Sequence, residues 1–159
     1  MLSLSSPYSQ PTSVKSLVRS VRDRLARMPI PLLELMGRVG VAAVFWKSAM
    51  VKLSSWGITL ELFREEYRVP LIPPESAAYL ATAAELACPV LIALGIGARF
   101  GAAALLAMTL VIQIFVYPGN WGEHLLWASV LAYVLTRGAG LISLDHLIAR
   151  FWLDADHRR

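Results

Sequence analysis

Among the ionisable side chains in the long apolar stretches of this sequence are Glu34, Arg38, Lys52 and Glu85. An unpaired charge inside a bilayer costs several kcal/mol, so such residues are paired, hydrated or directly involved in function. Their formal charges sum to zero, which allows a closed set of ion pairs around the head group of a ligand. A carboxylate beside basic groups can also hold and pass a proton. These residues therefore predict a buried polar pocket that contains Glu85.

Helical spacing places these charges on two faces. At about 100° per residue, Glu34, Arg38 and Lys52 fall within about 40° of one another, whereas Lys47 lies on roughly the opposite face. A rise of ~1.5 Å per residue places Arg38 and Lys47 about 7 Å on either side of the centre of their helix. Glu85 lies close to the middle of the next apolar stretch. Depth therefore favours Lys47 as the partner of Glu85.

Further polar residues lie in the other apolar stretches. Pro89 follows Glu85 by four residues and cannot donate to its carbonyl, so we expect a kink or a free acceptor there. Gln113 and Tyr133 contribute polar groups from two more stretches, and His124 begins the last one. The alternative role of these residues is to hydrogen-bond the helices to one another, as polar residues in membrane bundles often do.

The composition predicts a membrane protein. Of the 159 residues, 57% are hydrophobic and 16% are charged, and the mean hydropathy is +0.57. Soluble domains carry about 25% charged residues, so this chain has too little polar surface to be one. The single cysteine, Cys88, excludes intramolecular disulfides and cysteine-rich metal sites. The net charge of +4 gives no reason to expect nucleic acid as a partner.

Four apolar stretches predict the elements that position these residues, at 32–53, 77–97, 100–116 and 125–142. Their lengths suit helices that cross the hydrocarbon core. Turns rich in Gly and Pro connect the last three stretches, and short turns favour antiparallel neighbours. We therefore expect an all-α fold, an integral membrane four-helix antiparallel bundle with surface amphipathic helices at both termini.

The distribution of basic residues predicts the orientation. Ten Lys and Arg residues lie on one side of the expected spans and two on the other. The positive-inside rule then places both termini in the cytoplasm. Residues 1–28 are a basic segment with two interpretations. Either a helix at 13–28 lies on the membrane surface, or the segment is a solvated tail. Residues 149–159 form a cytoplasmic tail, and the external connection at 54–76 either caps the bundle with a short helix at 58–68 or is a linker.

Arg38, Lys52 and Glu85, followed by the segments 91–99 and 138–145, resemble in this order the DoxX family of small bacterial and archaeal membrane proteins. The resemblance covers most of the chain. It implies a four-helix bundle in the inner membrane, and family position suggests Arg38 as the partner of Glu85. The pairing of Glu85 with Arg38 or with Lys47 is thus left open by the sequence.

The last of these segments has a local interpretation. Gly138 and Gly140 can end the fourth span, Ser143 can cap a new helix, and Asp145 suits the positive end of that helix. A helix at 144–153 is expected on the cytoplasmic surface. The alternative is a direct role of Ser143 or Asp145 in binding a ligand.

The resemblance also implies candidate functions and partners for the predicted domain at 29–148. Members of the family are linked to thiosulfate:quinone oxidoreductase and to membrane assemblies with oxidative-stress or sulfur-handling enzymes. Others are encoded beside the machinery for metal-binding modified peptides, the group that residues 117–127 resemble most. The implied partners are an oxidoreductase or peptide-maturation proteins, and the implied ligand is a quinone, with no intrinsic cofactor.

Three functions from different classes remain open. The first is a quinone-linked redox or accessory subunit, in which the charged pocket holds the head group and His124 can bond a quinone carbonyl. Whether such a subunit is itself an enzyme is undecided. The second is a non-catalytic membrane anchor, and the third is a small permease, which would need an oligomer. His124 has no second histidine in sequence range, so we expect no metal site.

Overall fold

The computed structural model describes residues 14–156, all of whose regular elements are helices. Residues 1–13 of the predicted N-terminal segment and 157–159 of the predicted tail lie outside the described residues. The chain divides into two compact units, Met1–Ile30 and Pro31–Arg159. The all-α prediction is confirmed for the part of the chain that is described.

The first unit contains the helix α1, Val14–Ala26. Its apolar side chains Val14, Leu17, Val18 and Val21 are all exposed, and none of its residues is buried. The spacing of these side chains gives an amphipathic helix with basic residues on its other positions. The helix predicted at 13–28 is therefore present, and its exposed apolar face suits a membrane surface.

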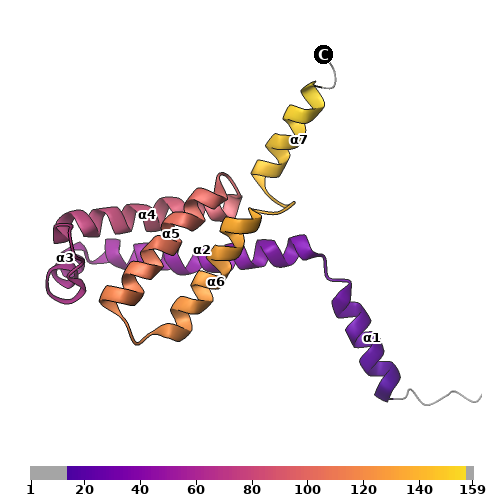
Figure 1. Ribbon diagram of the computed structural model, residues 1–159, viewed down its shortest axis with the longest axis horizontal. Coiled ribbons are helices and arrows are strands. Elements are labelled where there is room, and N and C mark those ends of the chain that lie inside the picture. The colour runs from indigo at the N-terminus through magenta and orange to yellow at the C-terminus, as the bar shows by residue number, and fades with distance from the viewer. Residues whose placement is uncertain (1–13, 157–159) are drawn as a thin grey trace, which may run out of the picture. The chain divides into compact units, whose positions relative to one another are not determined.

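The second unit contains the other helices (Figure 1). In chain order these are α2 (Ile30–Ser54), α3 (Trp56–Leu62), η1 (Phe63–Tyr67), α4 (Pro74–Leu94), α5 (Ala98–Val111), η2 (Ile112–Val116), α6 (Trp121–Arg137) and α7 (Leu144–Asp156). The elements η1 and η2 are single π-helical turns, which recur at functional sites in proteins. The short helix predicted at 58–68 is found as α3 and η1.

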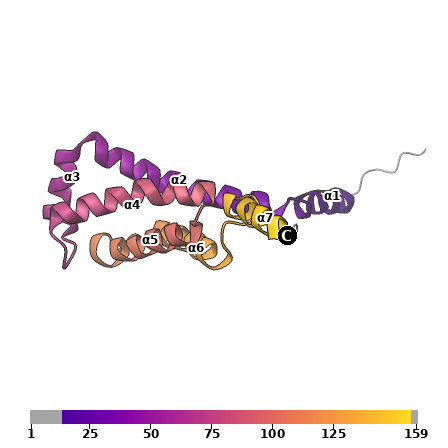
Figure 2. The same cartoon turned by 90° about the horizontal axis from the view of Figure 1, so that it is seen from above.

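The long helices share one apolar core. Figures 1 and 2 show α5 beside both α4 and α6, and the contacts of the backbone agree. Buried side chains come from α2 (Phe45), α4 (Ile92), α5 (Leu105) and α6 (Leu131). Helix α2 joins this core through side chains, for example by an edge-to-face contact between Phe45 and Trp127 with ring centroids 5.6 Å apart.

Close approach of α4 and α5 depends on small residues. A Cβ atom at Gly101 would lie 3.1 Å from the Cys88 carbonyl oxygen and 3.2 Å from an Ile92 side-chain atom. Ala98 and Ala102 flank Gly101 on α5 and are fully buried. Small residues on one face let two membrane helices approach closely and gain van der Waals contact. Such contact matters in a bilayer because lipid tails are as apolar as the side chains and provide no hydrophobic driving force.

Two helices are long and apolar enough to cross a membrane, namely α4 and the continuous helix Ala98–Val116. A third candidate arises if α1 and α2 count as one broken span. Helix α2 has 25 residues but carries four charged side chains, and α6 has only 17 residues. The structure thus supports a multi-pass membrane protein with two or three candidate spans, and the fourth span stays a prediction.

The ends of the predicted spans differ from the observed helices for local reasons. The stretch predicted at 125–142 is the helix Trp121–Arg137, because Gly138 adopts a φ of 86° and its N–H bonds the Val134 carbonyl. Helix α4 begins at Pro74, where a proline needs no N–H partner. It continues past Pro89, so this proline does not break the span.

Candidate functional site

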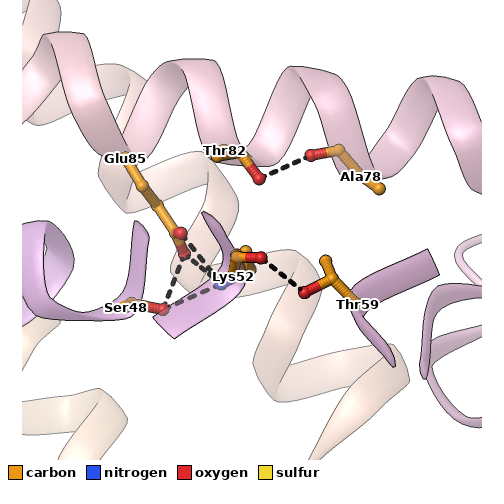
Figure 3. Close-up of polar contacts among 6 residues, drawn as sticks. All are labelled: Ser48, Lys52, Thr59, Ala78, Thr82 and Glu85. Carbon is orange, nitrogen blue, oxygen red and sulfur yellow. Dashed lines mark hydrogen bonds and ion pairs between the residues drawn. The ribbon is translucent and has the colours of Figure 1, made fainter. Parts of the chain in front are cut away.

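The partner of Glu85 is Lys52 (Figure 3). The Lys52 ammonium donates to both carboxylate oxygens, Nζ to Oε1 at 2.9 Å and Nζ to Oε2 at 2.8 Å. It also donates to Ser48 Oγ at 2.8 Å, and the Ser48 hydroxyl donates to Glu85 Oε1 at 3.1 Å. The side chains of Glu85 and Lys52 are only 4% and 16% exposed. We call Ser48, Lys52 and Glu85 the ion-pair cluster.

This pairing corrects the two alternatives that the sequence favoured. Arg38 lies fourteen residues before Lys52 on α2, which separates the two by ~21 Å along the helix. Lys47 is exposed on another face of α2 and makes no ion pair among the described residues. Lys52 reaches Glu85 because its four-carbon stem can carry the charge well away from the backbone.

The end of α2 is held beside this cluster by α3. The Thr59 hydroxyl, which is buried, donates to the Lys52 carbonyl at 3.0 Å (Figure 3). That carbonyl lies in the last turn of α2, where carbonyls lack helical partners. Neither Ser48 nor Thr59 was predicted from the sequence, although the spacing of Ser48 and Lys52, four residues apart on one helix, is a usable signal.

A cavity of about 390 Å³ borders the ion-pair cluster. Its walls come from α2, α4, α5, α6 and both π-helical turns. Phe63 and Tyr67 of η1 belong to the lining, so the connection at 54–76 does cap this cavity. The lining is mainly apolar, with Ser48, Lys52, Tyr67, Glu85, Tyr117, Asn120, Glu123 and His124 as its polar and charged members.

His124 lies in this cavity wall and is 3% exposed. Its Nδ1 lies 2.6 Å from Gln113 Oε1, and Gln113 Nε2 donates to the Pro118 carbonyl at 2.8 Å. Gln113 is itself buried on η2 but does not line the cavity. Three of the predicted pocket residues, Lys52, Glu85 and His124, thus border one cavity, and Gln113 supports His124 from outside the lining.

Arg38 belongs to a second, separate polar cluster. It is 1% exposed and donates to two backbone carbonyls, that of Ile92 at 3.4 Å and that of Ile142. Its Nε is buried without a hydrogen-bond partner in the part of the chain that is described. Arg38 therefore joins α2 to the end of α4 and to the segment between α6 and α7, far from Glu85.

Glu34 and Tyr133 lie near this second cluster. The Tyr133 hydroxyl donates to Glu34 Oε1 at 2.9 Å, which links α6 to α2. A Cβ at Gly140, whose φ is 75°, would lie 2.1 Å from Glu34 Oε2. The polar stripe predicted from Glu34, Arg38 and Lys52 is thus split by depth, because only Lys52 reaches Glu85.

Within the segment 138–145, Ser143 occupies the capping position expected for it. The Ser143 hydroxyl accepts a hydrogen bond from the His146 N–H at 3.2 Å, and α7 begins at the next residue, Leu144. The Asp145 carboxylate accepts from the Gly97 N–H at 3.0 and 3.1 Å, and the Asp145 N–H donates to the Gly95 carbonyl at 2.9 Å. Asp145 therefore also fixes the turn between α4 and α5, a role that the sequence did not reveal.

Tyr117 connects the η1 cap to the turn before α6. Its hydroxyl donates to Glu66 Oε1 at 2.9 Å, and its ring lies 5.9 Å from that of Tyr67 between centroids. Burial, followed by the contacts with Tyr67 and Glu66, raises the pKa of the Tyr117 phenol above its ordinary value. This residue lies just beyond the candidate span that ends at Val116.

Stability is therefore expected to fall at alkaline pH through Tyr117. A pKa that is raised in the folded state gives a stabilising contribution that is present below the ordinary value of 10.0 and is lost as the pH rises toward the folded-state pKa. The free energy of unfolding in micelles should thus decrease more steeply above pH 10.0 for the parent than for Tyr117→Phe. Equal slopes for the two proteins would contradict this contribution.

The fold and the site define a class, that of helical membrane proteins with a buried ion pair beside a capped cavity. Among the described residues, no group of three or more His, Cys, Asp or Glu side chains could hold a metal ion. Residues 33–118, more than half of the chain, match the family model of DoxX. The chain belongs to the DoxX family. Neither the curated proteins nor the solved structures contained a match.

The matched residues include Arg38, Lys52 and Glu85 but not the segment 138–145. The ion-pair cluster and most of the cavity thus lie within the family domain. The segment 138–145 has two structural roles here. Ser143 caps α7, and Asp145 bonds Gly97 and so fixes the turn between α4 and α5.

Proposed function

We propose that this DoxX protein is a membrane subunit that binds the ring head group of a quinone or quinol in the cavity beside the ion-pair cluster. The carrying observation is the cavity itself, at about 390 Å³ with a mainly apolar lining. Ligand pockets commonly measure ~300–1,000 Å³ and combine apolar walls with a few polar groups. When bound, a quinone would accept electrons and protons and a quinol would donate them.

The residues around the cavity fit such a ligand. Phe45, Phe63 and Trp127 offer aromatic surface to a flat ring. Glu85 and His124 offer polar atoms that can hold a ring oxygen or a proton at the wall. The single cysteine, Cys88, cannot form an intramolecular disulfide, and the proposal assigns the redox centre to a partner protein.

The same proposal includes a location. The excess of basic residues before α2 and after α6 supports cytoplasmic termini in an inner membrane. In that orientation the cavity, which borders the end of α2 and the η1 cap, lies toward the outer half of the bilayer. The Arg38 cluster lies toward the cytoplasmic half.

A cavity-filling substitution tests this function. Ala81 lines the cavity and Ala83, two residues later on α4, is exposed and does not line it. Ala81→Leu fills part of the space, and Ala83→Leu is the matched control. Each protein is purified gently from its native membrane and its retained small molecules are identified by mass spectrometry.

We expect quinone to be enriched above its level in bulk lipid in the parent and in Ala83→Leu. In Ala81→Leu we expect at least about tenfold less quinone, since a loss of ~1.4 kcal/mol of binding free energy lowers the affinity tenfold. Thermal unfolding of the three proteins verifies that the comparison is between folded chains. Quinone at bulk level in the parent, or equal enrichment in both variants, would overturn the proposal.

A further inference from the structure

The side-chain amide of Gln113 has a fixed orientation. The atom that lies 2.8 Å from the Pro118 carbonyl oxygen must be a donor, because a carbonyl oxygen only accepts. This atom is therefore Nε2, and the other amide atom, which faces His124, is the oxygen Oε1. Proline has no backbone N–H, so the chain offers no alternative donor at residue 118.

The orientation of Gln113 in turn fixes the tautomer of His124. Gln113 Oε1 lies 2.6 Å from His124 Nδ1, and since an amide oxygen only accepts, Nδ1 carries the proton. In the neutral imidazole the other nitrogen, Nε2, then has a lone pair and no proton. Within residues 14–156, His124 Nε2 makes no hydrogen bond. The His124 ring thus brings an acceptor to the cavity wall.

The ion-pair cluster also offers acceptors rather than donors. The three ammonium protons of Lys52 are matched by three acceptors, Ser48 Oγ and the two oxygens of Glu85. The Ser48 hydroxyl proton goes to Glu85 Oε1. Glu85 Oε2 accepts only from Lys52, so this carboxylate oxygen keeps capacity for one more donor.

One donor lies close to His124. Trp127 lines the same cavity, its ring centroid is 5.3 Å from that of His124, and its indole N–H makes no hydrogen bond among the described residues. A hydroxyl group both donates and accepts, so it can donate to His124 Nε2 and still accept from a donor such as an indole N–H. A carbonyl oxygen only accepts and would face the lone pair of His124 Nε2.

We propose that the cavity binds the reduced, hydroxyl-bearing form of its ring ligand in preference to the oxidised, carbonyl form, with His124 Nε2 as the acceptor for that hydroxyl. This inference rests on the proposed function and names the ligand form that the site selects. It reverses the expectation from the sequence that His124 bonds a quinone carbonyl. Gln113 acts as a positioning residue, because it sets the His124 tautomer without lining the cavity.

The test measures binding of a decyl-benzoquinone and of the corresponding decyl-hydroquinone to the full chain in lipid nanodiscs, without oxygen. We expect the parent to bind the reduced form about tenfold more tightly, as one hydrogen bond gained and one repulsive contact avoided imply. Gln113→Leu frees the His124 ring to change tautomer and should bring this ratio close to one. Thr109→Val, which removes another buried polar group one turn earlier on α5, should leave the ratio unchanged.

A second measurement reads the tautomer directly in the parent, so it does not depend on a variant that folds. In ¹⁵N spectra of histidine-labelled protein, we expect His124 to show a protonated Nδ1 and an unprotonated Nε2, and Gln113→Leu to lose this pattern. Equal affinity for the two forms, or a protonated Nε2, would overturn the inference but leave the proposed function standing. Failure of both forms to bind the parent would overturn the proposed function itself.

Discussion

Replacement of Lys52 by methionine is expected to lower the free energy of unfolding by about 3–5 kcal/mol, the usual effect of removing one partner of a buried ion pair. The Glu85 side chain is 4% exposed and would keep Ser48 as its remaining partner in the cluster. Methionine fills much of the volume of the lysine stem, so the loss reports the uncompensated carboxylate rather than a void. Reversible unfolding in mixed micelles measures the effect.

Two further variants separate charge from packing. The double variant of Lys52→Met with Glu85→Gln carries no charge in the ion-pair cluster, and it should recover at least about half of the loss, since neutral replacement of a whole pair costs little. Lys47→Met removes an exposed cation from the same helix and should change stability by no more than ~0.5 kcal/mol. A double variant that is as unstable as Lys52→Met alone would contradict the ion-pair account.

The helices of this protein follow closely from the sequence. Apolar runs bounded by Gly and Pro predicted α2, α4, α5 and α6, and the helical spacing of Val14, Leu17 and Val21 predicted α1. Cap chemistry located the start of α7, because Ser143 is a good N-cap residue and glycines precede it. These features are local, so a pattern along the chain is enough to identify them.

The partner of Glu85 could not be predicted from the pattern of residues along the chain. Helical spacing correctly placed Lys52 on the face of α2 opposite Lys47, but depth was judged from backbone position alone. The pairing depends on where the tip of a flexible side chain lies, and Lys52 Nζ meets a carboxylate from another helix. Sequence spacing contains the position of a Cα but not the reach of such a side chain.

The support of His124 depends on a turn that no pattern specified. Thr109 and Gln113 lie four residues apart on the continuous helix at 98–116, and both are buried. The π-helical turn at 112–116 then brings the Gln113 amide to both Pro118 and His124. Because this turn interrupts α-helical spacing, the hydrogen bond between Gln113 and His124 could not be predicted from the sequence.

Arg38 is expected to be the other residue whose loss affects stability most. Arg38→Met leaves the buried carbonyl of Ile92 and the partly buried carbonyl of Ile142 without their arginine donor. An unmet buried acceptor costs about 1–3 kcal/mol and a partly exposed one costs less, so we expect a loss of roughly 2–4 kcal/mol. Arg150→Met on the exposed side of α7 is the matched control, with a change within ~0.5 kcal/mol. Unfolding in mixed micelles again provides the measurement.

Gly95 gives an independent test of this junction, because its space is set by Arg38. A Cβ there would lie 2.4 Å from Arg38 Nη1 and 2.5 Å from Ser143 Cβ, and the φ of +70° disfavours any side chain. Gly95→Ala should therefore displace the guanidinium and destabilise the chain in the parent, and by clearly less when combined with Arg38→Met. Additive losses in the double variant would mean that Arg38 does not limit the space at Gly95, whereas a smaller combined loss would establish that α2, the end of α4 and the segment before α7 meet around Arg38.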